Sequence, residues 1–484
     1  MKSSVETIIV GAGPAGMAAA MELAKAGKDF LMLEKEATVG GLSKTYTIQE
    51  GDLVFRTDNG PHRFFSKNKY LYDFISEVLH DDWILVDRHT QQFIRGKFYD
   101  YPINALQVVR NVGPWYVLKI IADYSWAKIV YGLLRKQEKT FTDSAHAKFG
   151  KTLANFNILN YTEKIWGLST DELDSEWARQ RISGLNVTEV VATLFRKVFG
   201  TRTSSAKSLV DQFYYPKFGT GEIYETIRLD LVHRGYQIST NVSVIKVKHE
   251  NGRVVSVVYD VGGQSQEVSC NFLVESVHIT DFVHLLDPLP PEAVLSAARA
   301  LQFRSQVHLF ITLDRPQVTQ NQWIYFPDRG VLFARISEMK NFSSEMAPPG
   351  KTSLFVEFFC EEGDRIYNAS KEELLVMTIP VLEQYGFIKK EEVRNAYVFR
   401  GGKDYPVYTT EYKDHLSILK NYLDSFSNLF YIGRPGRFKY TNQDHSLEMG
   451  ILAAKGIVEN RRVDVESVGG EQDYFEKGFV PKKS

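Results

Sequence analysis

The stretch Val5-Glu6-Thr7-Ile8-Ile9-Val10-Gly11-Ala12-Gly13-Pro14-Ala15-Gly16 decides the fold. Residues 5–10 predict a short apolar strand, and residues 17–25 have the spacing of a helix. Gly27 ends that helix, and residues 30–33 predict a second strand that closes with Glu34. This order of strand, glycine turn, helix, strand and acid is typical of a dinucleotide-binding unit.

Each glycine of the turn has a physical role in that interpretation. Gly11 permits the tight turn, Gly13 lets the backbone approach a pyrophosphate, and Gly16 lets helix and strand pack closely. The helix N-terminus offers free N–H groups and the positive end of its dipole to the phosphates. Glu34 stands where an acid can accept from ribose hydroxyls. A lone glycine pattern also occurs in ordinary turns, but the elements around this one favour a nucleotide.

A second glycine pair indicates which dinucleotide binds. The segment Gly40-Gly41-Leu42-Ser43 follows soon after Glu34. A glycine pair followed by a small hydroxyl residue resembles FAD enzymes of the amine oxidase and glutathione reductase type, and an NAD dehydrogenase does not need it. The alternative is a surface turn. The resemblance therefore favours FAD as the cofactor.

Composition bounds the remaining possibilities. The chain has 484 residues, enough for two or three domains, with 44% apolar and 24% charged residues. Its net charge of −1 gives no general field that attracts nucleic acid. Cys270 and Cys360 are the only cysteines, which fits a reducing compartment, and we expect a cytoplasmic protein. No metal site is expected from them.

We also expect no secretory signal and no stable membrane insertion. Only four residues precede Val5, and no apolar run reaches about 18 residues. The nearest approach is the segment from Trp115 to Leu134, which is interrupted by charged residues. Its spacing suits an amphipathic helix, for which packing against the protein is favoured over contact with a membrane.

The order of predicted elements indicates an α/β protein. We expect a discontinuous Rossmann-type FAD-binding domain with a helical insertion and a second, mainly antiparallel β-sheet domain. The expected FAD-binding pieces are residues 1–75, 208–290 and 425–466, the helical insertion is 103–207, the sheet or substrate domain is 76–102 and 291–424, and the tail is 467–484. Within these pieces we expect a hairpin over 84–99, a β-rich run over 330–336 and a last helix over 446–461.

Several separated segments resemble UDP-galactopyranose mutase, a flavoenzyme family that interconverts pyranose and furanose sugar nucleotides. Residues 60–65, Gly-Pro-His-Arg-Phe-Phe, resemble a segment beside the flavin, with Phe65 in place of a second histidine. Residues 161–168 and 172–174 resemble the uridine-binding helix end and mobile loop. Residues 333–338, 405–407 and 433–440 resemble segments that contact the diphosphate and the flavin. Asn442 stands where that family has an aspartate.

The resemblance implies roles for particular residues. The residues expected to hold FAD are Gly11, Gly13, Ala15, Gly16, Glu34, Lys35, Gly41, Leu42, Ser43, Val244, Gly433, Arg434 and Ser446. The residues expected to bind substrate are Tyr161, Trp166, Arg179, Arg181, Arg335, Tyr405 and Tyr440, where the register leaves open whether Arg179 or Arg181 grips the pyrophosphate. Arg335, Arg434 and His62 are expected at the reacting centre. Each also has a purely structural alternative, such as pairing of Arg335 with Glu338.

Three functions remain open at this stage. The favoured one is an FAD-dependent sugar-nucleotide mutase, in which the resemblance implies the reduced flavin as nucleophile, an external electron donor and no net redox change. The second is an oxidoreductase of the amine oxidase or protoporphyrinogen oxidase type, which residues 216–221 resemble equally well. The third is a flavin-binding partner protein. In the first two cases a small molecule is the substrate, and the oligomeric state stays open.

Overall fold

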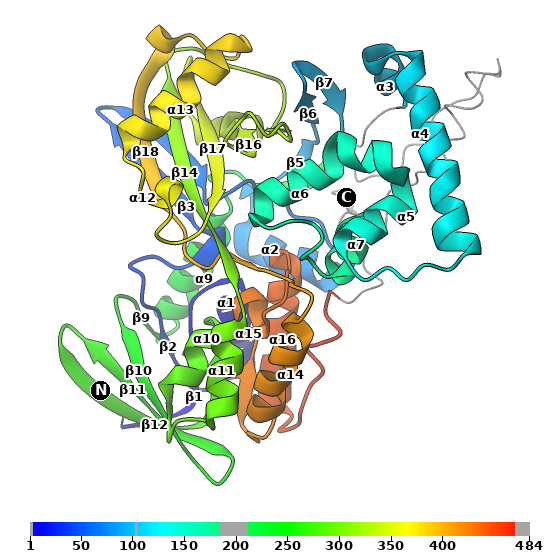
Figure 1. Cartoon of the computed structure of the whole chain (residues 1–484). Coiled ribbons are helices and arrows are strands. Elements are labelled where there is room, and N and C mark those ends of the chain that lie inside the picture. Colours follow the sequence, from blue (N-terminus) through cyan, green and yellow to red (C-terminus); the bar gives the residue numbers. More distant parts are fainter. Residues whose placement is uncertain (1–2, 102–104, 183–211, 470–484) are drawn as a thin grey trace.

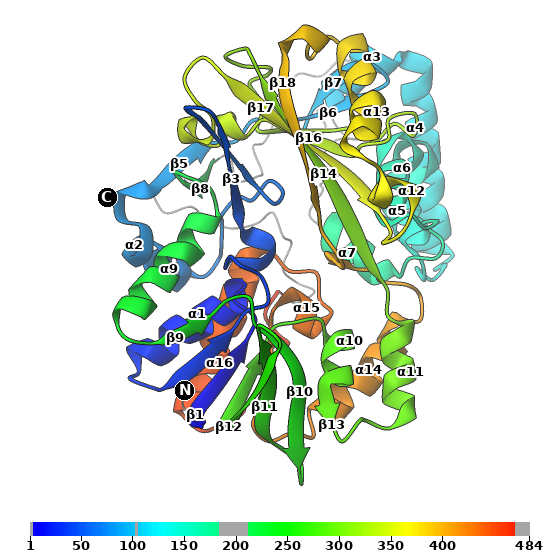
Figure 2. The same cartoon turned by 90° about the vertical axis from the view of Figure 1, so that its left-hand side faces the viewer.

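The structure is a computed structural model that describes residues 3–101, 105–182 and 212–469. Two mixed sheets of eight strands each form its two halves, and a group of helices lies beside the second sheet (Figures 1 and 2). Two further ladders have two strands each. The two sheets have separate hydrophobic cores, so each half buries its own apolar face.

The first sheet is built around strand β1, Ser4–Val10, which pairs in parallel with β2, Phe30–Leu33, on one side and with β12 on the other. Its strands run in the order β13-β10-β11-β12-β1-β2-β9, and β20 pairs with β12. The other strands are β9 Gln237–Ser239, β10 Ser243–Glu250, β11 Arg253–Val261, β12 Gln264–Glu275, β13 Leu286–Asp287 and β20 Leu429–Tyr431. Strands from the three pieces of sequence assigned to the nucleotide domain thus share one sheet.

Helix α1, Pro14–Lys25, lies between this sheet and α16, Gln443–Val458. Its small buried residues let the two helices approach closely: a Cβ added at Gly450 would lie 2.1 Å from the carbonyl oxygen of Ala15. The C-terminal helix is therefore pressed against the first turn of α1. The other helices of this half are α2 Lys69–Leu79, α9 Gly221–His233, α10 Ile279–Phe282, α11 Glu292–Ala300, α14 Tyr412–Leu423 and α15 Gly433–Arg437.

The second sheet runs in the order β18-β14-β17-β16-β15-β6-β7, with β19 paired to β14. Its strands are β6 Thr90–Ile94, β7 Lys97–Asp100, β14 Phe303–Leu313, β15 Trp323–Tyr325, β16 Arg335–Ser337, β17 Thr352–Cys360, β18 Val393–Arg400 and β19 Tyr405–Pro406. Alternate residues of β14 and β17 pack with helix α13, Lys371–Gln384, in one apolar core. Helix α12, Arg365–Asn368, lies nearby. The intervening residues of β14 and β17 point to the opposite face of the sheet.

The helical insertion lies beside the second sheet (Figure 1). It contains α3 Ala105–Val112, α4 Pro114–Ala127, the π-helix η3 Lys128–Leu133, α5 Phe141–Leu153, the π-helix η4 Ala154–Ile158, α6 Leu159–Trp166 and α7 Ser175–Ile182. The expected insertion continues to residue 207, and its last part lies outside the described residues. One face of α4 packs against α5, but the opposite face is exposed. The expectation of a packed helix from Trp115 to Leu134 therefore holds for only one of its faces.

The expected hairpin over residues 84–99 is wrong in its first half. Strand β5, Trp83–Asp87, pairs with β8, Gln212–Pro216, far along the chain, and only β6 and β7 form a hairpin. That hairpin turns at Arg95 and Gly96, which both have positive φ. The other ladder is β3 Thr45–Glu50 with β4 Leu53–Asp58. Pairing between distant segments overrides the local signal here.

Three further expectations differ from the structure in extent. Residues 330–334 form a turn and irregular backbone, so the β-rich run is reduced to β16. Helix α16 begins at Gln443 rather than Ser446, because Asn442 caps it. The expected tail, residues 467–484, is anchored through its first residues, since Val468 is buried and its carbonyl accepts from Lys439 Nζ at 2.9 Å. Residues 470–484 lie outside the described part.

Candidate active site

The glycine turn after β1 has the geometry expected of a phosphate-binding loop. Gly11 has a φ of +94°, and a Cβ added there would lie 2.5 Å from Ser276 Oγ. A Cβ at Gly16 would lie 2.0 Å from the carbonyl oxygen of Gly11, closer than any real contact. Gly13 is the N-cap of α1, whose first-turn N–H groups have no acceptor within the helix. The loop therefore needs its glycines and presents backbone donors.

Glu34 closes the second strand beside this loop. Its carboxylate accepts from the N–H of Ala12 at 2.7 Å and from the N–H of Glu36 at 2.8 Å. These two bonds fix the carboxylate next to the glycine turn at the carboxyl end of the sheet, where a ribose is bound in such folds. Lys35 is exposed next to it, and Val244 lies on β10, two residues after Val242, whose N–H bonds the carbonyl of Glu34.

The second glycine pair lies directly against the first turn. Gly40 donates its N–H to the carbonyl of Ala12 at 2.8 Å, and a Cβ at Gly41 would lie 3.1 Å from Gly13 Cα. Gly41, Leu42 and Ser43 form the short 3-10 helix η1. The two glycine segments thus form one continuous backbone surface, as a cofactor lying across both would require.

The C-terminal motif reaches the same place. Gly433 has a φ of +78°, and a Cβ there would lie 3.2 Å from Ala15 Cβ. Ser446, in the first turn of α16, is buried, and its Oγ lies 3.2 Å from Thr441 Oγ1. Gln443 accepts from Tyr224 Oη at 3.0 Å, while its buried Nε2 has no partner among the described residues. This unpaired donor, with the glycine surfaces, fits a polar cofactor at the junction of α1 and α16.

The second sheet carries a row of ionisable side chains on one of its faces. Arg335 on β16, Glu357 on β17 and His308 on β14 are directly paired across adjacent strands, so they share one face. Arg335 Nη2 donates to Glu357 Oε1 at 2.6 Å, and Nε bonds the other oxygen. Burial alone would lower the pKa of Arg335, but pairing with Glu357 raises it well above its usual value. Arg335 pairs with Glu357 and not with Glu338, which bonds Thr352 and loop amides.

His62 is the residue that connects Arg335 to Arg434. Burial, followed by the positive charges of Arg434 and Arg335, lowers the pKa of His62 to about 3. Its Nδ1 is buried without a partner among the described residues. With its pKa lowered in this way, His62 is neutral at pH 7, and the positive charges of both arginines reach its ring.

Arg434 lies among aromatic rings at this site. Its guanidinium carbon is 4.9 Å from the Tyr405 ring centre and 5.0 Å from that of Tyr440, and Nε donates to the Thr441 carbonyl at 3.0 Å. The two tyrosine rings are nearly parallel, with centres 5.7 Å apart. Burial raises the pKa of Tyr405 to about 12, so its hydroxyl stays a donor at neutral pH.

The helical insertion adds its own aromatic side chains. Tyr161 on α6 meets Tyr325 edge to face at 5.4 Å, and the Arg335 guanidinium lies 5.9 Å from the Tyr325 ring centre. Trp166, at the end of α6, is 6.2 Å from the Tyr405 ring centre, and its buried Nε1 has no partner among the described residues. The structure therefore brings Tyr161 and Trp166 to the same site as Arg335 and Tyr405.

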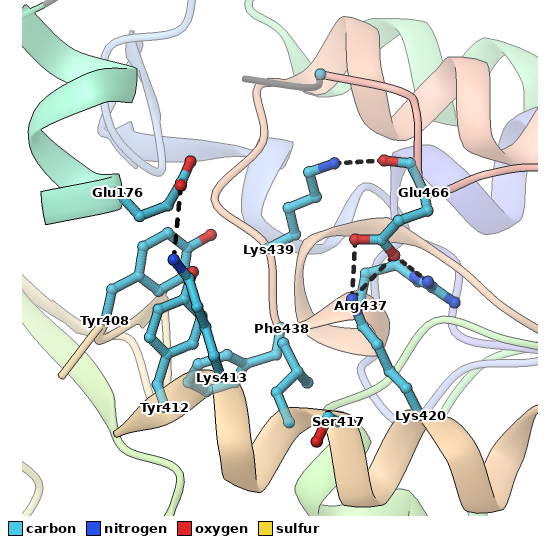
Figure 3. A pocket seen from close by; sticks show the side chains of 12 residues that line it. Glu176, Tyr408, Tyr412, Lys413, Ser417, Lys420, Arg437, Phe438, Lys439 and Glu466 are labelled. Atoms are coloured by element: carbon cyan, nitrogen blue, oxygen red, sulfur yellow. Dashed lines mark hydrogen bonds and ion pairs between the residues drawn. The ribbon is translucent and has the colours of Figure 1, made fainter. Parts of the chain in front are cut away.

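Arg179 lies elsewhere. Its Nη2 pairs with Glu176 Oε2 at 2.9 Å, and Glu176 lines a separate cavity of about 390 Å³ (Figure 3). In that cavity Lys420 and Arg437 point toward the carboxylate of Glu466, and Lys413 points toward Glu176. Arg181 belongs to α7, but its side chain is outside the described part of the structure.

Three site residues were missed by sequence reasoning: Glu357, His308 and Tyr325. His308 has no exposed surface, and burial with the charges of Arg335 and His62 lowers its pKa to about 3. A usable signal existed for two of them, since Glu357 and His308 are the single charged or titratable residues inside the apolar runs 353–359 and 307–313. A buried polar residue in a strand is a candidate site residue.

Comparison with known proteins shows the family of the chain. The family model described as flavin containing amine oxidoreductase matches residues 14–458. The chain belongs to this family. FAD is accordingly its cofactor, and the glycine surfaces and the unpaired Gln443 Nε2 fit that group.

Two curated relatives match only part of their length. A probable UDP-galactopyranose mutase of Klebsiella pneumoniae is 24% identical over 170 residues, which cover 34% of this chain and 42% of the relative. An L-amino-acid oxidase of Crotalus adamanteus is 24% identical over 332 residues, which cover 64% of this chain and 58% of the relative. In both cases the match spans less than two thirds of the relative.

Solved structures match over nearly the whole fold. A reduced UDP-galactopyranose mutase has a TM-score of 0.82 at 21% identity and covers 96% of this chain and 97% of its own. A putative protoporphyrinogen oxidase from Exiguobacterium sp. 255-15 has a TM-score of 0.69 at 16% identity and covers 95% and 99%. At these identities the likeness establishes the fold. Among the described residues, no helix is both long and apolar enough to cross a bilayer.

Proposed function

We propose that this protein is an FAD-dependent mutase that interconverts the pyranose and furanose forms of a sugar nucleotide. The observation that supports the proposal is geometric: Arg434 lies 4.9 Å from the Tyr405 ring centre, and the Tyr405 ring lies 5.8 Å from Phe359, two residues along β17 from the partner of Arg335. The charges of both arginines also act on His62. Two guanidinium groups suit a diphosphate, which they bind with paired hydrogen bonds.

The surrounding side chains suit the other parts of such a substrate. Tyr405 and Tyr440 carry hydroxyls next to Arg434, where they can donate to phosphate oxygens. Tyr161 and Tyr325 present ring faces near Arg335, and a flat uracil can stack on one of them. In this arrangement the base lies against the helical insertion and the diphosphate lies between the arginines.

The protein's own chemical contribution is then charge stabilisation and positioning. Cleavage of the bond between sugar and diphosphate leaves negative charge on the departing phosphate, and Arg335 and Arg434 stabilise that charge. Glu357 holds the Arg335 guanidinium in a fixed orientation. His62, neutral because its pKa is about 3, can hydrogen bond without adding a third positive charge. Bound reduced FAD supplies the nucleophile, so no protein nucleophile is required.

The test is turnover in each redox state of the cofactor. UDP-galactopyranose is incubated with the holoprotein, either reduced with dithionite or fully oxidised, and the two sugar nucleotides are separated by chromatography. We expect interconversion by the reduced protein alone, with an Arg335→Ala variant at least a hundredfold slower. Turnover by the oxidised protein in the absence of reductant would refute the proposal.

An amino-acid or amine oxidase is the second candidate, and the long match to L-amino-acid oxidase favours it. Phe65 and Asn442, which depart from the mutase pattern, weaken the first candidate. Against the oxidase, the Arg434 guanidinium repels a cationic amine, whereas the charge of Arg335 is balanced by Glu357. Arg434 could still pair with an amino acid's carboxylate. Rapid bleaching of the flavin by an amino acid without oxygen, and no interconversion of sugar nucleotides, would establish this second function.

A further inference from the structure

Helix α4 and the π-helix η3 carry an exposed apolar stripe that neither the fold nor the active site uses. Trp115, Trp126 and Leu133 are 83%, 63% and 77% exposed, and Leu118 and Ile129 are 45% and 42% exposed. At about 100° per residue the three side chains on α4 fall within an arc of about 80°, and Ile129 and Leu133 on η3 follow them along the chain. Figure 1 shows α4 at the outer edge of the helical insertion, turned away from both sheets.

The opposite side of the same helix already supplies the packing. Val117 and Ile120 are 1% exposed and Ala127 is 5% exposed, and α4 packs against α5. A helix that is apolar on both sides is normally buried on both sides. The outer stripe is therefore unexplained by the folding of this chain, and a contiguous exposed apolar surface marks an interaction site.

The charges around the stripe are nearly all positive. Between Ala105 and Gln137 the sequence has five basic residues and one acid, Asp123. Asp123 is turned inward and accepts from the N–H of Thr152 at 3.1 Å. Lys119 is exposed along the edge of the stripe, and Arg135 is exposed just beyond its C-terminal end. The stripe therefore has a cationic border without an outward carboxylate of its own.

We propose that α4 and η3 form a docking surface for an anionic lipid bilayer, with the helix lying in the plane of the membrane interface. Tryptophan, leucine and isoleucine on one face with cations beside them are the composition of interfacial helices. The cations attract anionic headgroups. From Trp115 to Leu133 the stripe is about 27 Å long, so it lies along the surface over several lipids.

A second copy of the chain suits the stripe less well. Lys128 is turned to the packed side, where its Nζ donates to the carbonyl of Ala147 at 3.3 Å, so Lys119 and Arg135 are the exposed cations beside the stripe. The stripe of a second copy has no outward carboxylate to meet them, because Asp123 is bonded to Thr152. An anionic surface supplies the missing negative charge, so charge complementarity favours lipid as the occupant.

The test is cosedimentation of the FAD-loaded full-length protein with vesicles. The probes are vesicles of equal phosphatidylglycerol and phosphatidylcholine, and vesicles of phosphatidylcholine alone. Leu133→Glu is compared with Leu289→Glu, which changes a 63% exposed leucine outside the stripe. We expect binding to the anionic vesicles that falls at least tenfold in Leu133→Glu, remains in Leu289→Glu, and weakens with salt. Flavin absorbance per protein checks that both variants are folded.

Three results would overturn the proposal. The parent protein could fail to sediment with anionic vesicles, or Leu133→Glu and Leu289→Glu could bind them equally. Alternatively, light scattering could show a dimer of the parent that Leu133→Glu converts to a monomer, with no lipid binding by either, which would make a second copy the occupant. None of these results depends on which reaction the protein catalyses.

Discussion

The ion pair between Arg335 and Glu357 allows a quantitative prediction, because Glu357 has no exposed surface and both its oxygens accept from Arg335. Replacing Glu357 by glutamine keeps the shape but removes the negative charge and turns an amide donor toward a guanidinium donor. Removing one partner of a buried pair costs about 3–5 kcal/mol. The Arg335 side chain is 17% exposed and therefore partly screened, so we expect Glu357→Gln to lower the free energy of unfolding by about 2–3 kcal/mol.

The assay is urea unfolding of the FAD-loaded protein, followed by flavin and tryptophan fluorescence. Glu361→Gln is the matched control, since Glu361 also pairs with an arginine, Arg304, at 3.1 Å, but its side chain is 65% exposed. Solvent around Glu361 screens its charge, and buried Arg304 keeps its bonds to the carbonyls of Ile165 and Phe359, so we expect a loss of less than about 1 kcal/mol. If Glu357→Gln destabilises the protein no more than Glu361→Gln, Glu357 does not neutralise Arg335.

Three other changes have defined outcomes. Gly16→Ala should abolish FAD retention, because the added Cβ would lie 2.0 Å from the Gly11 carbonyl oxygen. The control Gly330→Ala has open space around the added Cβ and should keep FAD. The ratio of flavin to protein absorbance measures FAD retention in both variants. His308→Phe should flatten the acid side of the stability profile. Because the pKa of native His308 is lowered to about 3, the folded protein takes up no proton there between pH 6.5 and about 3, whereas the unfolded chain does, so the free energy of unfolding decreases by up to about 1.4 kcal/mol for each unit by which the pH is lowered. Urea titrations at pH 6, 5 and 4 should lack that contribution in the variant. An unchanged slope would contradict a buried neutral His308. Arg434→Lys should keep FAD but bind UDP about tenfold more weakly, as measured by calorimetry. Lysine lacks the planar guanidinium group that donates to the Thr441 carbonyl beside two tyrosine rings. Equal affinity of the variant and the parent for UDP would show that Arg434 is not part of the binding site.

The nucleotide-binding half was predictable from sequence because its signals are local. The turn at Gly11 and the close approach at Gly16 depend on residues within a few positions, and the glycines are required by positive φ or by contact. FAD as the cofactor was also predicted, from the second glycine pair, and the family confirms it. The α/β fold with two sheets is confirmed as well.

The second sheet was less predictable because its site depends on register between distant strands. Nothing near Glu357 indicates that it faces Arg335, since the pairing of β16 with β17 decides this. The same reason explains why β5 was assigned to the wrong partner. For α4, the apolar period predicts a helix, but it does not tell which of two apolar faces meets the protein.

We propose that FAD and a nucleotide diphosphate bind side by side, with Arg335 in contact with the diphosphate. Titration of the oxidised holoprotein with UDP, followed by the visible absorbance of the flavin, measures this directly. We expect a saturable change in the flavin spectrum for the parent and none for Arg335→Ala, with FAD retained in both. A flavin spectrum that UDP leaves unchanged in the parent protein, while calorimetry detects no binding, would contradict it.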